Sequence, residues 1–376
     1  MQESMFKYRD YLSEDMINTI NSSELKGIDL FCGIGGFRIA MEKSNIACVY
    51  SSDIDAFAQK TYFSNFNEVP DGDITAVDIP KIPKFDILTA GFPCQPFSYA
   101  GKNQGFDDKL RGTLFFNVHQ IIKHHRPAMF LLENVKGLKS HKGGDTMETI
   151  INSLNENGLG YKVKYAILNS YDFGLPQYRE RWYCVGFRDD VDFTFPQGKN
   201  RGVKLSEIIR EEDNNDRKLS LTKFEIERIQ YHFERAINGE RIQHDNSKYE
   251  PNTKKGKHGI YSYQKPDKSL RFHVGDFAKT QIQEAFYACL NTYAPTIIAN
   301  RVPKLWDIGR KLSVREAARL QGFPDDFMFP VSDAQAYKQL GNSISVPVVS
   351  AIIKEMTNSF KKYQQETQTQ RSNYAL

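Results

Sequence analysis

Apolar runs and amphipathic stretches alternate along the first half of the chain. Short apolar runs predict strands at residues 27–31, 47–52, 85–90 and 128–133, and two more near 161–168 and 181–187. Stretches with apolar residues at helical spacing predict helices at residues 35–44, 55–66 and 113–125, and one near 145–157. Strands that alternate with helices predict an α/β fold, in which a parallel sheet carries helices on both faces.

This alternation stops at about residue 197. Residues 198–333 are polar and irregular, and we interpret them as a second, smaller domain. Within it, residues 251–271 carry six basic side chains and one acid, with aromatic residues interleaved. A basic patch with aromatics suits a nucleic-acid backbone, although a solvated loop explains the same composition at least as well. The helical pattern returns at Gln335 and predicts a helix over 345–360, which would complete the first domain over 334–362.

The two ends of the chain are polar. In the N-terminal extension, residues 1–25, Tyr8, Leu12, Met16 and Ile20 recur at helical spacing, which fits either a docking helix or a loosely attached arm. The Gln-rich residues 363–376 predict a disordered tail.

Length and composition narrow the class of protein. With 376 residues, the chain is longer than one small core usually organises, in agreement with two domains. The net charge of +4 permits a polyanionic partner without requiring one. The sequence has neither a membrane-length apolar run nor the order of a signal peptide, so we expect a cytosolic protein. The five cysteines include no C-x-x-C pair, which argues against a disulfide framework or a zinc site.

The first chemical signal is "DLFCGIGGF", residues 29–37, where glycines join a predicted strand to a helix. Glycines there let a ligand approach a helix N-terminus, and Asp53, at the end of the next strand, is placed to bind ribose hydroxyls. NAD and S-adenosylmethionine both fit such a site. The spacing is not G-x-G-x-x-G, which makes pyrophosphate less favoured, and tight packing alone also explains the glycines.

Three further signals lie at predicted strand ends. Cys94, in "GFPCQPFS", lies between two prolines and is either a displayed nucleophile or an inert buried thiol. Glu133 ends an apolar run, so desolvation should raise its pKa, although it also fits a simple helix N-terminal acid. Arg179 and Arg181 share one face of a strand, an arrangement that is costly unless the two guanidinium groups meet acceptors.

Taken together and in order, these stretches resemble the cytosine carbon-5 DNA methyltransferases, particularly the single-chain type II enzymes of bacterial restriction–modification systems. The matching stretches are "DLFCGIGGF", "GFPCQPFS", "LLENV", "QYRERW", "RKLSVREAARLQGFPDDF" and "AYKQLGNSISVPV", which together span residues 29 to 350. The resemblance implies a Rossmann-like, S-adenosylmethionine-dependent methyltransferase fold, with a mixed sheet and helices on both faces. Its catalytic domain would cover residues 26–197, and the target-recognition domain would cover 198–333.

The resemblance also implies a cofactor site for S-adenosylmethionine, which leaves as S-adenosylhomocysteine. Its residues would be Phe31, Gly33, Ile34, Gly35, Asp53, Ile54, Asp73, Ile74, Pro93, Leu114, Asn342 and Ile344. Asp53 matches the acid that binds ribose, and Asp73 matches the acid that binds the adenine amino group. Relatives often carry Trp where this chain has Ile54, so adenine stacking would rest more on Phe31.

For catalysis, the resemblance implies that Cys94 adds to carbon 6 of a flipped-out cytosine. Glu133 would serve ring nitrogen 3, Arg181 would bind the ring carbonyl, and Arg179 would help to order the Cys94 segment. The loop 97–111 resembles the family's closing loop. Ser98 and Thr296 would contact the DNA backbone.

The implied function is methylation of carbon 5 of cytosine in a specific duplex DNA sequence, which would protect host DNA alongside a partner endonuclease. Such an enzyme would be a bacterial monomer that associates with the nucleoid through DNA. One eukaryotic branch of the family acts on transfer RNA, so an RNA cytosine-5 methyltransferase is the alternative. A nicotinamide oxidoreductase fits the fold alone, and a non-catalytic DNA-binding relative would lack the reactive residue types that this chain retains.

Overall fold

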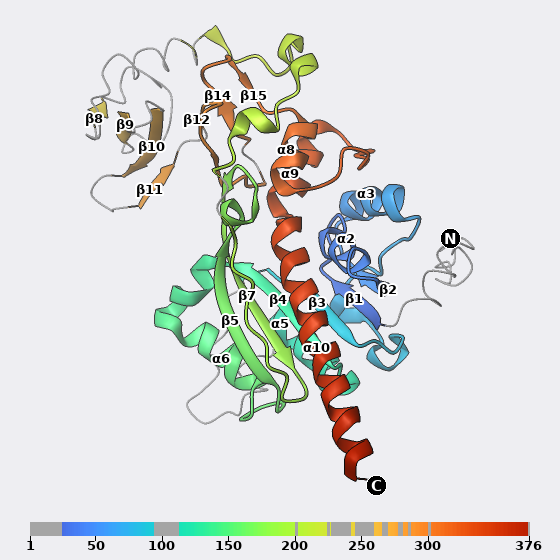
Figure 1. Ribbon diagram of the computed structural model, residues 1–376. Coiled ribbons are helices and arrows are strands. Elements are labelled where there is room, and N and C mark those ends of the chain that lie inside the picture. Colours follow the sequence, from blue (N-terminus) through green and yellow to red (C-terminus); the bar gives the residue numbers. More distant parts are fainter. Residues whose placement is uncertain are drawn as a thin grey trace.

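The computed structural model describes most of the predicted catalytic domain and parts of the second domain (Figure 1). The described residues are 25–93, 113–199, 202–223, 226, 242–244, 259–264, 270–276, 281–284, 287–299 and 302–374. Several expectations lie outside these residues, namely the N-terminal extension, the closing loop, most of the basic patch, Cys94 and Ser98.

A six-stranded sheet forms the centre of the catalytic domain, and all six predicted strands are present. Its strands are β1 (Leu25–Leu30), β2 (Ile46–Ser52), β3 (Ile87–Gly91), β4 (Met129–Val135), β5 (Lys162–Asn169) and β7 (Glu180–Phe187). Their order across the sheet is β2-β1-β3-β4-β7-β5. The strands β2, β1, β3 and β4 are parallel to one another.

The expectation of an all-parallel sheet is wrong for β7, which runs antiparallel to both β4 and β5. The mixed sheet that the family resemblance implied is confirmed. The reason is the short connection between β5 and β7. It contains only a short 3-10 turn (Ser170–Phe173) and the two-residue strand β6 (Gln177–Tyr178). A parallel neighbour needs a longer crossover, usually through a helix, so this connection returns the chain antiparallel.

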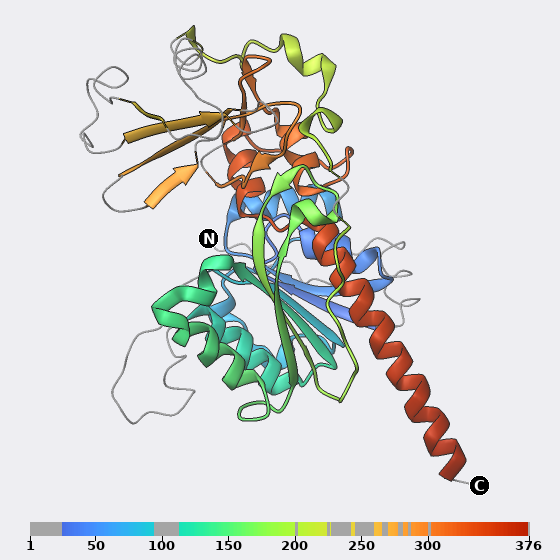
Figure 2. The same cartoon turned by 60° about the vertical axis from the view of Figure 1, so that its left-hand side comes forward.

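Helices cover both faces of the sheet, as expected (Figures 1 and 2). One face packs against α5 (Leu114–His125) and α6 (Asp145–Leu154). The other packs against α2 (Gly36–Glu42) and α10 (Val346–Tyr374). The helix α3 (Ala56–Phe66) follows β2.

The side chains of each central strand alternate between these two layers. Phe130 and Leu132 of β4 face α5 and α6, whereas Met129 and Leu131 face α2 and α10. All four are fully buried. Burial on both faces explains why β4 reads as an uninterrupted apolar run in the sequence.

Among its described residues, the second domain consists mainly of short strands and irregular segments, in agreement with the irregular domain expected from the sequence. Its strands are β8 (Ile242–His244), β9 (Gly259–Gln264), β10 (Leu270–Asp276), β11 (Gln281–Glu284), β12 (Tyr287–Ala288), β13 (Ala294–Pro295), β14 (Lys304–Leu305) and β15 (Arg310–Lys311). Strands β8 to β11 form an antiparallel sheet in the order β11-β10-β9-β8. The described helices after it are α8 (Val314–Gln321) and α9 (Asp333–Asn342), followed by α10.

The boundary predicted near residue 333 does not separate two independent cores. From the second domain, Ala317, Ala318 of α8 and Phe323 are buried in one cluster with Ile34 and Ala58 of the catalytic domain. Helix α8 therefore packs against both parts of the chain. We keep the predicted division as a proposal, with α8 at the junction.

The C-terminal tail differs from the expectation. The helix α10 continues through Tyr374, so residues 363–374 are helical rather than disordered. Its last turns are mostly exposed, and they carry the Gln-rich composition that predicted a tail. Among the described helices, α10 included, none is long and apolar enough to cross a membrane.

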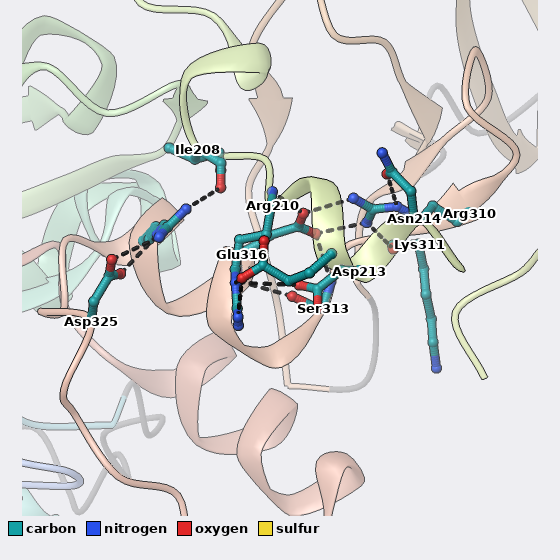
Figure 3. Close-up of polar contacts among 11 residues, drawn as sticks. Ile208, Arg210, Asp213, Asn214, Arg310, Lys311, Ser313, Glu316 and Asp325 are labelled. Atoms are coloured by element: carbon teal, nitrogen blue, oxygen red, sulfur yellow. Dashed lines mark hydrogen bonds and ion pairs between the residues drawn. The ribbon is translucent and has the colours of Figure 1, made fainter. Parts of the chain in front are cut away.

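A buried ion pair between Arg310 and Glu316 fixes the start of α8 against residues 210–214 (Figure 3). Two nitrogens of Arg310 donate to the two carboxylate oxygens of Glu316, at 2.8 and 2.7 Å. The same carboxylate accepts the backbone N–H groups of Ser313 and Arg210, each at 2.8 Å. Arg310 also donates to Asn214 at 2.9 Å. Both charges are thus paired and hydrogen-bonded, as burial of charged groups requires.

We predict that Glu316→Ala lowers the free energy of unfolding by about 3–5 kcal/mol, because it leaves the Arg310 guanidinium buried without its counter-charge. Urea unfolding, followed by the signal of the two tryptophans, measures this loss.

The matched control is Asp325→Ala. It breaks the more exposed ion pair between Arg319 and Asp325, which lies beside this network. Exposed ion pairs contribute little, so the loss should be less than about 1 kcal/mol. Equal losses for the two variants would contradict the assignment of the Arg310–Glu316 pair as the fixing contact.

Candidate active site

A cavity of about 480 Å³ lies where the carboxyl ends of β1 to β4 meet. Open α/β sheets hold ligands at this edge. Because β7 is antiparallel, its first residues reach the same edge, and Arg179 and Arg181 therefore line the cavity opposite the strand ends.

The turn between β1 and α2 forms one wall of the cavity. Phe31, Gly33 and Gly35 all have positive φ, at 55°, 55° and 87°. Glycine adopts this conformation freely, whereas for Phe31 it is strained. A side chain at Gly35 would also meet the Phe66 ring, because a Cβ there would lie 2.2 Å from it. The turn thus needs the glycines that the sequence places there.

Asp53 holds this turn against the end of β2. One carboxylate oxygen accepts the backbone N–H of Gly33 and the other accepts that of Asp55, both at 2.8 Å. Burial raises the pKa of Asp53, and these two hydrogen bonds oppose that shift. Carboxylate oxygens have further lone pairs, so Asp53 can also accept from hydroxyl groups of a ligand in the cavity.

Eleven of the twelve predicted cofactor residues line the cavity. They are Phe31, Gly33, Ile34, Asp53, Ile54, Asp73, Ile74, Pro93, Leu114, Asn342 and Ile344. Gly35 is the exception and supports the turn behind the wall. Ile54 is 73% exposed at the mouth, whereas Ile74 is buried beside Asp73. The hydrogen bond from the Thr75 backbone N–H lowers the pKa of Asp73, which keeps that carboxylate charged.

The end of α9 and the residues directly after it form another wall of the cavity. Ile344 packs against Gly36 so closely that a Cβ on this glycine would lie 2.6 Å from the Ile344 side chain. Lys338 pairs with Asp55 at 2.8 Å, and Gln339 donates to the Phe57 carbonyl at 2.8 Å. Lys338 and Gln339 also line the cavity and were not predicted from the sequence, although they lie in the same stretch as Asn342.

Glu133 and Arg181 meet at the other end of the cavity. Glu133 is nine-tenths buried, and one of its carboxylate oxygens lies 3.2 Å from Nε of Arg181. Burial raises the pKa of Glu133, and the charges of Arg181 and Arg179 oppose that shift without cancelling it. The predicted desolvation of this acid and the upward direction of its pKa shift are thus supported.

Arg179 binds backbone carbonyls, whereas its predicted contact with the Cys94 segment lies outside the described residues. Its guanidinium donates to the carbonyls of Ile297, Gly341 and Ser343, at 2.8, 3.2 and 2.6 Å. Burial lowers the pKa of Arg179 to about 9. Among the described residues its Nε has no partner, so one donor is left for a group outside them.

Asn134 holds the segment that precedes Cys94, because its side chain donates to the Phe92 carbonyl at 2.9 Å. Asn134 lines the cavity and was missed, although it stands beside Glu133 in "LLENV". The chain is described up to Pro93 on the cavity wall. Cys94 therefore follows directly from this wall, and its thiol lies outside the described residues, as does Ser98.

Thr296 lies where the second domain meets the catalytic domain. Its hydroxyl donates to the Tyr178 carbonyl at 2.7 Å, directly before Arg179. The hydroxyl oxygen can still accept a hydrogen bond from a ligand. Its predicted contact with a DNA backbone remains a prediction.

The cavity therefore has two chemically different ends. One end has a glycine-containing turn and Asp53, an acid placed to bind ribose hydroxyls, which suits an adenosine-containing cofactor. The other end has an acid with a raised pKa beside two guanidinium groups, which suits a planar ring with a carbonyl and a basic nitrogen. A transfer from the first ligand to the second fits this geometry.

Comparisons with known proteins agree with this interpretation. A family model for C-5 cytosine-specific DNA methylase matches residues 25–358. The chain is 43% identical to the type II methyltransferase M.HpaII of Haemophilus parainfluenzae, over 88% of each chain. It is 37% identical to the type II methyltransferase M.HhaI of Haemophilus parahaemolyticus, over 90% of this chain and 97% of the relative.

Solved structures share the fold at lower identity. The Dnmt2 methyltransferase of S. pombe superposes with a TM-score of 0.58 at 18% identity, over 88% of this chain and 97% of that one. The Entamoeba histolytica methyltransferase EhMeth gives a TM-score of 0.58 at 18% identity, over 90% of this chain and 99% of that one. These matches confirm the expected fold.

We predict that Arg181→Met destabilises the protein in a pH-dependent way. Without Arg181, the folded-state pKa of Glu133 rises further above its unfolded value. The folded state then keeps a proton that the unfolded state releases, so stability falls as pH increases above the ordinary glutamate pKa. Between about pH 5 and pH 8 the loss should grow toward about 3–5 kcal/mol, measured by urea unfolding.

The control is Lys136→Ala, which removes an exposed ion pair with Glu180 at the same sheet edge. It should cost less than about 1 kcal/mol. A loss for Arg181→Met that stays constant across this pH range would show that Glu133 is not the group that responds.

Proposed function

The chain belongs to the family of C-5 cytosine-specific DNA methylases, and from this membership we propose that it transfers a methyl group from S-adenosylmethionine to carbon 5 of cytosine in double-stranded DNA. The observation that carries the proposal is the pairing of Glu133 and Arg181 at one end of a cavity whose other end has the cofactor-type features of Asp53.

Cofactor binding follows from the cavity wall. The glycine turn lets S-adenosylmethionine approach the backbone, and Asp53 would accept from its ribose hydroxyls. Asp73 would accept from the adenine amino group, with Ile74 and Phe31 on the faces of the ring. Bound there, the cofactor supplies an electrophilic methyl group. Because Ile54 is exposed, Phe31 and Leu114 carry more of the apolar contact.

The reaction needs an activated cytosine, since carbon 5 of the free ring is a poor nucleophile. Cys94, as a thiolate, adds to carbon 6. Glu133 holds or donates a proton at ring nitrogen 3, and Arg181 donates to the ring carbonyl, which relieves the charge that builds during addition. Carbon 5 then attacks the methyl group. Its proton leaves to water or hydroxide, and release of the thiolate restores Cys94.

Arg179 has a supporting part in this proposal. Its carbonyl contacts hold the second domain and the final stretch around Gly341 at the cavity. Its remaining donor, Nε, is available for the Cys94 segment, as the family resemblance implies. Asn134 fixes the same segment from its other side through Phe92.

A stacked cytosine cannot reach this cavity, so the target base must be flipped out of the duplex. In the proposal, the loop 97–111 closes over the flipped base, with Ser98 and Thr296 at the DNA backbone. The domain over 198–333 reads the sequence.

The relatives' names support a role in type II restriction–modification, with a restriction endonuclease as the functional partner. We also propose that the protein acts as a monomer, as the family resemblance implies. Action on chromosomal DNA would bring the protein to the nucleoid.

We predict that the protein transfers labelled methyl groups to duplex DNA and that Cys94→Ser reduces this transfer at least about 1000-fold, because a hydroxyl cannot replace the thiolate. Binding of the same DNA should persist in the variant, since the thiol serves the reaction rather than recognition. Filter-bound label and a gel-shift assay measure the two quantities.

The matched control is Cys184→Ser, a fully buried thiol on β7 that has no part in the reaction and should leave the rate constant unchanged. An RNA transcript of the same sequence, tested in parallel, should accept no label. Transfer to RNA alone would replace DNA as the substrate, and normal turnover by Cys94→Ser would remove the assignment of the nucleophile.

A further inference from the structure

We propose that Gln177, together with Gln321, is a positioning residue that couples the placement of the target-recognition domain to the geometry of Glu133 and Arg181. This inference rests on the proposed function, because it assigns a role in the same reaction. Its basis is a set of buried hydrogen bonds that the cavity chemistry itself does not require.

The side chain of Gln177 is fully buried, and all of its hydrogen-bonding groups are used. Its Nε2 donates to the Leu320 carbonyl at 3.0 Å and to Oε1 of Gln321 at 3.1 Å. Its Oε1 accepts the backbone N–H of Ile297 at 2.9 Å. One amide thus joins strand β6 to both α8 and the segment that follows β13.

Gln321 extends the connection to the final stretch of the chain. This side chain, also fully buried, donates to the Leu340 carbonyl at 2.8 Å and accepts from Ser345 at 3.3 Å. Leu340 and Ser345 flank Asn342 and Ile344, which line the cofactor end of the cavity. The amide pair therefore touches segments that reach both ends of the cavity.

The backbone of Ile297 is held at both its N–H and its carbonyl. Gln177 binds the N–H of Ile297, and Arg179 binds its carbonyl at 2.8 Å. Thr296, next along the chain, donates to the Tyr178 carbonyl between them. The parallel pairing of β13 with β6 continues the same contact, with Ala294 opposite Gln177. Residues 294–297 and 177–179 thus form one hydrogen-bonded unit.

This hydrogen-bonded unit connects the recognition domain to the catalytic residues. Residues 294–297 belong to the recognition domain, and residues 177–179 continue directly into β7. Arg181, two residues after Arg179, contacts Glu133 at 3.2 Å. A shift of residues 294–297 when DNA binds is therefore passed to Arg181, because the backbone groups between them are bound to one another.

An amide is the side chain that this position requires. The neighbouring groups are two acceptors, the Leu320 carbonyl and Oε1 of Gln321, and one donor, the Ile297 N–H. Glutamine supplies two donor hydrogens and one acceptor oxygen, and matches them all. A methionine of similar length keeps the volume and removes every one of these bonds, so the backbone of Ile297 would be held only at its carbonyl, by Arg179.

The test uses the full-length protein and its own recognition duplex, which is identified beforehand by bisulfite sequencing of DNA from cells that express it. Gln177→Met should lower the single-turnover rate constant for methyl transfer by about 100-fold, since small misplacement of reacting groups is costly. Gln321→Met, which disturbs the same link from the other side, should act in the same direction. Dissociation constants for S-adenosylhomocysteine and for DNA should change by less than about 3-fold, because neither side chain lines the cavity.

The rate constant, rather than the burst amplitude, separates positioning from mere loss of folded protein. A partly unfolded variant turns over fewer molecules at an unchanged rate constant. The control is Gln120→Met, a partly buried glutamine on α5 away from the cavity, which should change neither quantity. The double variant of Gln177 and Gln321 should be no slower than the slower single variant, because both break one link.

Unchanged rate constants in Gln177→Met and Gln321→Met, with a normal wild type, would overturn the inference and leave the proposed function intact. A reduced amplitude at a normal rate constant would also overturn it, as would independent, additive losses in the double variant. If the wild type itself transfers no methyl group to any DNA, the proposed function fails first.

Discussion

The direction of one strand determines the chemistry of this molecule. Because β7 runs antiparallel between β4 and β5, its first residues lie at the edge where the parallel strands end. Arg181 is thereby a diagonal neighbour of Glu133 on one face of the sheet, within 3.2 Å. Were β7 parallel, as alternating strands and helices led us to expect, the two arginines would lie at the far edge, and the buried acid would have no counter-charge.

Burial of the charged groups at this end of the cavity costs free energy, which hydrogen bonds from the rest of the site offset. Desolvation raises the pKa of Glu133 and lowers the pKa of Arg179. Backbone carbonyls of Ile297 and of the stretch Gly341–Ser343 accept from the Arg179 guanidinium, and Gln177 accepts from the backbone N–H of Ile297. The same bonds bring the second domain and the chain's final stretch to the cavity. The hydrogen bonds that pair these buried polar groups thus also hold the two domains together.

Sequence patterns predicted what depends on local order along the chain. The apolar runs located all six strands, and the glycine turn with Asp53 located the cofactor end of the cavity, because each signal lies within a few neighbouring residues. Contacts between distant segments were not predictable in this way. The partners of Arg179, the amide pair of Gln177 and Gln321, and the position of α8 at the domain junction all depend on tertiary packing. The Gln-rich composition near residue 370 predicted a tail, yet the chain continues there as an extension of α10.

The central claim is that this cavity activates cytosine by covalent addition, with Glu133 and Arg181 supporting the charge that develops. Duplex DNA in which 5-fluorocytosine replaces the target base tests it most directly, because fluorine cannot leave as a proton does. With S-adenosylmethionine present, the account predicts a protein–DNA complex that survives denaturing electrophoresis and is absent when Cys94 is replaced by serine. Normal methylation of the unsubstituted duplex, without any trapped complex on the fluorinated one, would contradict it.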